Sequence, residues 1–264
     1  MTDRAGVRAP AVAGLFYPEK PDDLEASVRR HLEAAAWSGT TRPKAVIAPH
    51  AGYVYSGPTA GFAFAALATR AEEIERVVLL GPAHRVAPAG LALPGVLSFE
   101  TPLGRVAVDQ ELAERIAHLP QLEINDAAHE LEHSLEVEIP FLQVVLGEFM
   151  LLPLVVGGAS PAEVAEVLDL VWGGDETAIV VSSDLSHFLS YDEATRVDRA
   201  TVEKILRLEG PLRPDQACGA YPINGLLEVA ARRHLSAEVV DLRNSGDTAG
   251  DHRRVVGYTA VAFH

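Results

Sequence analysis

The chain has 264 residues, of which 48% are hydrophobic, and its formal net charge is −15 at pH 7. A chain of this length and composition can bury the core of one domain, and we expect a single domain over residues 1–264. The negative charge argues against nucleic acid and anionic membrane surfaces as partners, because both are negatively charged and no cluster of Lys and Arg offsets the repulsion.

The same composition bears on location. No apolar run reaches the roughly 18 residues of a membrane span, and the first residues lack the apolar stretch of a signal peptide. We therefore expect a soluble protein of the cytoplasm. The single cysteine, Cys218, excludes a disulfide within the chain. It is then a buried apolar side chain, an intermolecular crosslink or a functional thiolate.

In chain order, short apolar runs alternate with helical patterns. Continuous apolar strands separated by helices are typical of a mostly parallel sheet covered on both faces, so the predicted fold class is α/β. A Pro- and Gly-rich segment predicts a hairpin or loop, and the last residues predict a strand that is antiparallel or at an edge. The strands are expected at 44–50, 76–84, 149–156, 177–187 and 255–264, the helices at 57–67 and 161–172, and the hairpin at 88–109.

Three of the predicted strands lead into a histidine. KAVIAP is followed by His50, RVVLLGPA by His84 and AIVVSSDLS by His187. Because the ligand crevice of an open α/β sheet lies outside the carboxyl ends of its strands, we expect the three histidines to converge there. Asp184 precedes His187 by three residues, and its carboxylate could fix the imidazole tautomer or approach a metal.

The stretch HELEH at 129–133 raises an alternative, because it fits both H-E-x-x-H and H-x-x-E-H. In such motifs two histidines on one helix face bind zinc and a glutamate activates water. The surrounding sequence disfavours this zinc hydrolase. Four glutamates crowd nine residues, which suits a helix N-terminus. Pro140 disfavours regular helix just before it, or else starts a new helix near Ile139. We interpret HELEH as a chance match.

Five motifs in order extend the pattern: PHAGYVYSG, LLGPAHR, EHSLEVEIPFLQ, SSDLSHF and ACGAYPINGLL. Together they resemble the Memo family, including its AmmeMemoRadiSam system protein B type. The resemblance implies a fold similar to that of the class III extradiol dioxygenases. It also implies one transition metal bound by His50, His84 and Cys218, with His187 as catalytic base and Asp184 beside it. The family motif in this region is EHSLE, which begins at Glu132, so His129 lies outside the resemblance.

The cysteine is a departure from the ring-cleaving relatives, in which the third ligand is a glutamate. A site of two histidines and one thiolate is softer, and it suits copper or zinc while still allowing iron. With the resemblance included, we expect Fe(II) or copper in preference to zinc. Ring cleavage itself does not follow from such a ligand set.

Two hypotheses for function remain open. The leading one is a dioxygenase-like, metal-dependent oxidoreductase in which His187 moves a proton and Asp184 orients it. The alternative is a non-catalytic module that binds a peptide or partner protein in the same cleft. The ligand would be a small molecule or a peptide, and the resemblance implies a functional link to radical-SAM and AMMECR-type proteins. Tyr53, Tyr55 and His133 are candidates for the cleft wall, although packing is the favoured interpretation of the two tyrosines.

Overall fold

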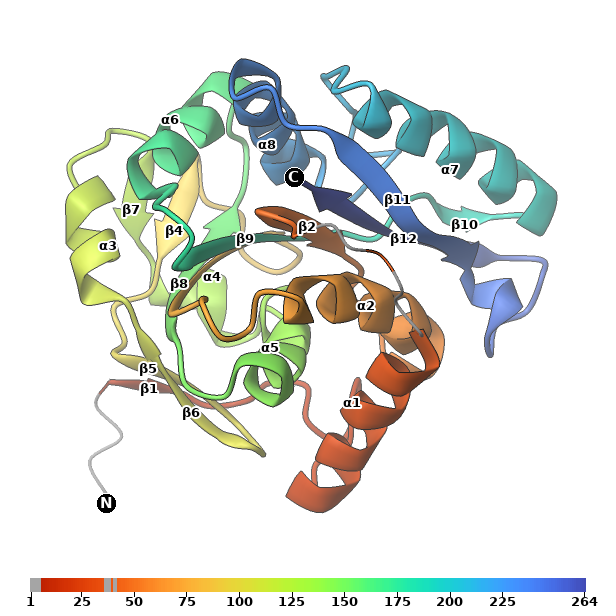
Figure 1. Cartoon of the computed structure of the whole chain (residues 1–264), viewed down its shortest axis with the longest axis horizontal. Coiled ribbons are helices and arrows are strands. Elements are labelled where there is room, and N and C mark those ends of the chain that lie inside the picture. Colours follow the sequence, from red (N-terminus) through yellow and green to blue (C-terminus); the bar gives the residue numbers. More distant parts are fainter. Residues whose placement is uncertain (1–5, 36–38, 40–41) are drawn as a thin grey trace.

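The computed structural model describes residues 6–35, 39 and 42–264. Its centre is a row of parallel strands in the order β8 (Met150–Val156), β3 (Arg76–Pro82), β9 (Thr177–Ser182) and β2 (Ala45–Ala48) (Figure 1). These strands are almost entirely buried, as the continuous apolar runs of the sequence predict. The α/β fold with a mostly parallel centre is confirmed.

The sheet continues on both sides of this row and becomes mixed, reaching 12 strands in the described part of the chain. On the β8 side, β6 (Gly104–Val108) runs parallel to β8 and forms the hairpin expected within 88–109 with β5 (Ser98–Thr101). On the β2 side, β12 (Val255–Phe263) is antiparallel, as predicted. It is not at an edge, because two further strands pair with it. The remaining strands are β1 (Val7–Arg8), β4 (Leu91–Leu93), β7 (Leu122–Ile124), β10 (His187–Leu189) and β11 (Ala237–Asn244).

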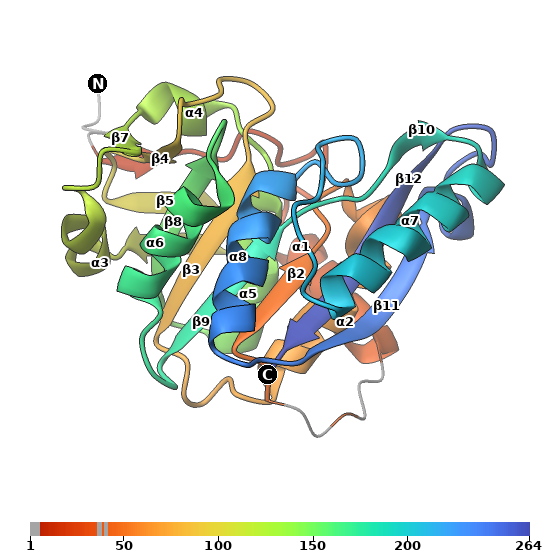
Figure 2. The same cartoon turned by 90° about the horizontal axis from the view of Figure 1, so that it is seen from above.

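Helices cover both faces of the sheet. The α-helices are α1 (Pro21–Ala35), α2 (Tyr53–Ala68), α3 (Gln110–Ile116), α4 (Asp126–Glu130), α5 (Ile139–Leu146), α6 (Pro161–Val171), α7 (Tyr191–Leu206) and α8 (Ala220–Arg232), and the 3-10 turns are η1 (Glu136–Glu138) and η2 (Ser245–Asp247). Figure 2 shows α6 and α8 over one face, with α1, α2 and α5 over the other. As expected, Pro140 lies in the first turn of α5.

Two hydrophobic cores result, one on each face of the sheet. Alternate residues of a strand point to opposite faces, so β2 sends Ala45 and Ile47 into the core beneath α6 and α8. It sends Val46 and Ala48 into the core beneath α1, α2 and α5. Because β2 packs against a hydrophobic core on each face of the sheet, the position of its carboxyl end is fixed.

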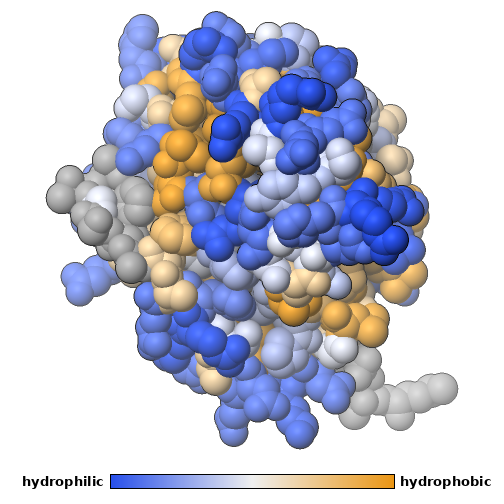
Figure 3. All heavy atoms as spheres, turned by 90° about the vertical axis from the view of Figure 1, so that its right-hand side faces the viewer, coloured by the Kyte–Doolittle hydropathy of each residue, from blue (hydrophilic) through white to orange (hydrophobic). Residues whose placement is uncertain are grey.

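The outer surface is largely polar. Figure 3, which faces the side bearing α7, shows mainly hydrophilic residues interrupted by smaller apolar areas. The helix α7 follows this pattern, with Ala194, Val202 and Ile205 buried beneath a charged outer face. Across the residues that the structure describes, none of the helices is both long enough and apolar enough to cross a membrane.

The four parallel strands end at the same edge of the sheet. His50, His84 and Asp184 are each the second residue after a strand, following β2, β3 and β9. Neighbouring parallel strands therefore bring together side chains that are far apart in the sequence.

Candidate metal centre

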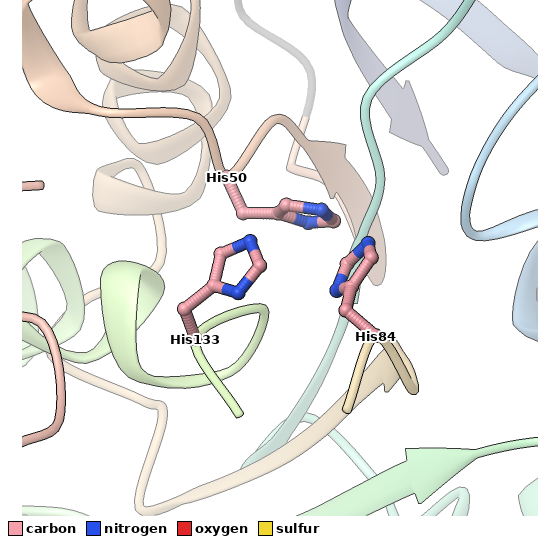
Figure 4. Close-up of side chains that lie close together, drawn as sticks. All are labelled: His50, His84 and His133. Carbon is pink, nitrogen blue, oxygen red and sulfur yellow. The ribbon is translucent and has the colours of Figure 1, made fainter. Parts of the chain in front are cut away.

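Three histidines meet at this edge: His50, His84 and His133. One ring nitrogen from each lies within 4.8 Å of those of the other two. Figure 4 shows the three rings turned toward one another, His50 from the end of β2, His84 from the end of β3 and His133 from the turn after α4. His50 is buried, whereas the His84 side chain is 28% exposed. The group is therefore open to solvent on the His84 side.

His50 is held by two groups from the β9 end. Its backbone N–H donates to Asp184 Oδ1 at 2.9 Å, and its Nδ1 lies 2.6 Å from Ser182 Oγ. Because Nδ1 is engaged, Nε2 is the atom available for a ligand. Burial lowers the pKa of His50 well below its usual value, and the positive charges of neighbouring histidines add to this. The ring is thus neutral at pH 7, as a metal ligand must be.

His84 and His133 share one carboxylate, that of Glu132. Glu132 Oε1 lies 2.9 Å from His84 Nδ1 and 3.3 Å from His133 Nδ1, while Oε2 accepts the His84 backbone N–H. Burial raises the pKa of Glu132, but hydrogen bonds from His84 and Ser134 outweigh it and hold the pKa at about 2. A carboxylate behind a histidine fixes its tautomer and increases its basicity toward a metal.

Cys218 lies beside His50 and is half-buried. Its Sγ is 3.4 Å from His50 Nε2 and accepts the Asp184 backbone N–H at 3.3 Å. Burial raises the pKa of the thiol, so it carries its proton at neutral pH in the absence of a metal. Metal binding would displace that proton.

The structure therefore brings His50 and His84 together as expected, and adds His133, which we had assigned to the cleft wall. Cys218 touches His50 but is not part of this group of three. His187, expected to converge with His50 and His84, begins β10 and is not part of the group either.

His187 and Asp184 have different partners from those expected. The Nδ1 of His187 donates to the Leu185 backbone carbonyl at 2.9 Å, so this carbonyl, rather than Asp184, fixes its tautomer. Burial lowers the pKa of His187, which leaves a neutral ring with Nε2 able to accept a proton. Asp184 instead supports His50. Burial raises its pKa to about 7 despite the backbone hydrogen bonds from His50 and Ala51.

The two tyrosines after His50 differ. Tyr53 is buried and its hydroxyl donates to the Val137 carbonyl at 2.8 Å, so it packs in the core and does not line the cleft. Tyr55, in the same turn of α2, is 39% exposed. Of the two tyrosines, only Tyr55 is exposed enough to contact a ligand.

The two histidines of HELEH do not share a site. The helix α4 ends at Glu130, and His129 is buried with its Nε2 2.9 Å from the Ala92 carbonyl. Within the described residues, the histidine group includes His133 but not His129. The geometry therefore gives the zinc hydrolase no support.

Sequence reasoning also missed three supporting residues: Glu132, Ser182 and Glu138. A signal existed for Glu132, which directly precedes His133 in the EHSLE motif. There was none for Ser182 or Glu138, whose contact depends on packing between β9 and η1.

Fold and site together define an α/β protein with a histidine-rich candidate metal centre at the carboxyl edge of a parallel sheet. The family model described as "Memo-like protein" matches residues 8–262, and the chain belongs to this family. The resemblance inferred from the five motifs is confirmed.

Relatives cover almost the whole chain. A MEMO1 family protein of Aquifex aeolicus is 37% identical, and one of Methanosarcina barkeri is 35% identical; each alignment spans 97% of this chain and 99% of the relative. Among solved structures, an uncharacterized protein from Escherichia coli K12 is similar with a TM-score of 0.53 and 13% identity, over 83% of this chain and 99% of that one. That likeness concerns the fold alone.

Proposed function

We propose that this protein is a metal-dependent oxidoreductase that binds one iron or copper ion and acts on a small molecule or peptide at the open side of the site. The observation that supports it is the set of imidazoles whose Nδ1 atoms are engaged by Ser182 or Glu132, which leaves their Nε2 atoms for a ligand. This arrangement of engaged Nδ1 and available Nε2 is common among metal-binding histidines. A bound iron or copper ion would supply Lewis acidity and one-electron chemistry.

For the ligands we propose His50, His84 and Cys218. The half-buried thiol lies 3.4 Å from His50 Nε2, close enough for both atoms to approach one ion. We assign His133 to the substrate side of this set. Its ring stacks on that of His84, with centroids 4.6 Å apart and an interplanar angle of 26°, so it would lie beside a bound ion. Imidazole and thiolate ligands together suit copper or zinc and allow iron, and we propose iron or copper because the proposed activity needs a redox-active metal.

His187 is proposed as the proton acceptor. Its ring is neutral, its Nδ1 is fixed by a backbone carbonyl, and its Nε2 can take a proton from a bound substrate. Asp184 is a positioning residue in this scheme, because it holds the backbone of His50 and the thiol of Cys218. Since Cys218 is a free thiol, we also propose the cytoplasm, where thiols are kept reduced, as the location.

Metal content tests the proposal directly. We expect close to one iron or copper per chain by mass spectrometry of anaerobically purified protein. His50→Ala should lose it and His129→Ala, the matched control outside the group, should keep it. A protein that binds no metal, or that keeps its metal in His50→Ala, would contradict the proposal.

A second candidate, peptide binding in the same cleft, is favoured by exposed aromatic side chains that are close in sequence to site residues. Tyr55, Phe188 and Tyr221 are exposed, and each follows a site residue closely in sequence. Phe188 has a φ of 62°, an unusual conformation for a bulky residue. The Arg254 guanidinium lies 4.9 Å from its ring centroid. Binding of an aromatic, acidic peptide to metal-free protein, measured by calorimetry and lost in Phe188→Ala, would support this candidate. Equal binding by both proteins would exclude it.

A further inference from the structure

Ser182 lies beneath His50 with three polar neighbours around its hydroxyl oxygen. The distances from Ser182 Oγ are 2.6 Å to His50 Nδ1, 2.6 Å to the Ser134 carbonyl oxygen and 2.8 Å to Glu138 Oε1. All four residues are buried, with Ser182, Ser134 and Glu138 at 0% exposure. Protons in this cluster therefore cannot be exchanged freely with water.

Counting hydrogens limits how the cluster can be arranged. A serine hydroxyl has one hydrogen to donate and two lone pairs to accept with, and a backbone carbonyl can only accept. The short contact with the Ser134 carbonyl therefore takes the single Ser182 hydrogen. The other two contacts must then be donated to Ser182, one by His50 Nδ1–H and one by a protonated Glu138 carboxyl. If Glu138 were ionised, the Ser134 carbonyl and the Glu138 carboxylate would both be acceptors. The single Ser182 hydrogen could satisfy only one of them, and the other would face the serine oxygen without a hydrogen in between.

The other oxygen of Glu138 leads to the same conclusion. Among the described residues, Glu138 Oε2 is buried and has no hydrogen-bond partner. A buried carboxylate oxygen without a partner is strongly unfavourable, whereas a neutral carboxyl avoids most of this penalty. Burial also raises the pKa of Glu138 well above its usual value. The hydrogen bond with Ser182 lowers the pKa of Glu138 in part, whereas the negative charge of Asp184 raises it further. Burial raises the pKa of Tyr53 further above its ordinary value, so this phenol brings no charge to the cluster.

We propose that Glu138 is a neutral carboxylic acid that positions His50 through Ser182: it donates to the serine oxygen, turns the serine hydrogen toward the Ser134 carbonyl, and so keeps the serine as acceptor for His50 Nδ1–H. Nε2 of His50 is thereby left with its lone pair toward the site. The proposal rests on the proposed function only in treating His50 as a ligand.

The consequence is an asymmetric site. His84 and His133 have an ionised carboxylate behind them, whereas His50 has a neutral chain of serine and carboxylic acid. A carboxylate partner makes an imidazole a stronger donor to a metal than a neutral partner does. Glu138 therefore keeps His50 a weaker donor to a metal than His84, and it adds no negative charge to the site.

The protonation of Glu138 can be tested on metal-free protein, so the result does not depend on whether a metal binds. We expect the infrared spectrum of protein with ¹³C-labelled glutamate to show the C=O band of a protonated carboxyl at neutral pH. The band should vanish in Glu138→Gln and persist in Glu130→Gln, a control at an exposed glutamate of the same segment. Absence of the band, or its persistence in Glu138→Gln, would overturn the proposal.

The positioning role needs a second readout. In metal-free protein, ¹⁵N NMR should show His50 protonated at Nδ1 in wild type and in Glu138→Gln, whose amide can still donate to Ser182. In Ser182→Ala this preference should be lost. A wild-type His50 protonated at Nε2 would refute the scheme.

A double-mutant cycle separates positioning from packing. Glu138→Leu should weaken metal binding by about tenfold when Ser182 is present and have little further effect in Ser182→Ala, while Glu138→Gln stays within about threefold of wild type. An equal effect of Glu138→Leu in both backgrounds would show that the residue acts by packing alone. If no variant and no wild type binds metal, the proposed function fails while the infrared and NMR results still decide the state of Glu138.

Discussion

The backbone N–H and the ring Nδ1 of His84 bind the two oxygens of a single carboxylate, that of Glu132, at 2.5 and 2.9 Å. The same carboxylate accepts the backbone N–H groups of His133 and Ser134 at 2.9 and 3.0 Å. One buried side chain therefore ties the end of β3 to the turn that carries His133. The relative placement of two histidines at the site depends on it.

Replacing Glu132 with Gln should weaken metal binding by roughly 10- to 100-fold, because His84 and His133 lose the charge that orients their rings. A competition assay with a chelator of known affinity measures this. Glu130→Gln, exposed and two residues away, is the matched control and should bind as wild type does. If Glu132→Gln also binds as wild type does, the carboxylate does not tune the site.

Cobalt substitution tests Cys218 as a ligand. Co(II) bound by a thiolate absorbs in the near ultraviolet, so we expect such a band in wild type and in His133→Ala. It should be lost in Cys218→Ser while cobalt remains bound through His50 and His84. A band that survives in Cys218→Ser would show that Cys218 is not a ligand. Loss of cobalt in His133→Ala would show that His133 is a ligand.

Asp198 should give stability a pH dependence between about pH 4 and pH 6. Burial raises its folded-state pKa to about 6 from 3.8, although the hydrogen bond from the Ser186 backbone N–H opposes the shift. The folded state therefore holds this proton more tightly than the unfolded state does. The resulting stabilisation is complete below about pH 4 and is lost as the pH rises through 6, a change of up to about 3 kcal/mol.

Asp198→Asn removes this dependence, because an amide does not titrate in this range. In urea unfolding between pH 4 and pH 7, the free energy of unfolding of the variant should increase relative to wild type as the pH rises. Asp192→Asn, an exposed position on the same helix, should keep the wild-type profile. Parallel profiles for wild type and Asp198→Asn would show that Asp198 does not titrate in this window.

Gly219 allows the start of α8 to approach β9 closely. A Cβ at this position would lie 2.6 Å from Ser183 Cβ and 2.8 Å from the Ser182 carbonyl oxygen. Gly219→Ala should cost about 1–3 kcal/mol of stability and should also displace the adjacent Cys218, lowering metal affinity. Thermal unfolding and metal titration measure the two effects. Gly158→Ala, where a Cβ meets no atom within 4 Å, is the control. Identical melting temperatures for the two variants would contradict this packing argument.

The parts of this protein that follow from the sequence are those set by local patterns. Continuous apolar runs make buried parallel strands whatever surrounds them, and each strand leads into the loop residue that follows it. The positions of His50 and His84 at one edge could therefore be predicted, as could the family, which depends on motifs contiguous in the chain. His187 was expected with them, but β9 ends at Ser182 and His187 belongs to the next strand, β10.

The partners of those residues could not be predicted, because each depends on how segments far apart in sequence pack together. Asp184 lies three residues from His187, yet it binds the backbone of His50, because β9 pairs with β2. HELEH reads as one helix, but α4 ends within it, so His129 and His133 go to different places. Glu138 meets Ser182 only because η1 packs against the end of β9. Hydrogen-bond partners in a buried site are chosen by distances of a few tenths of an ångström, and only the assembled tertiary structure sets those distances.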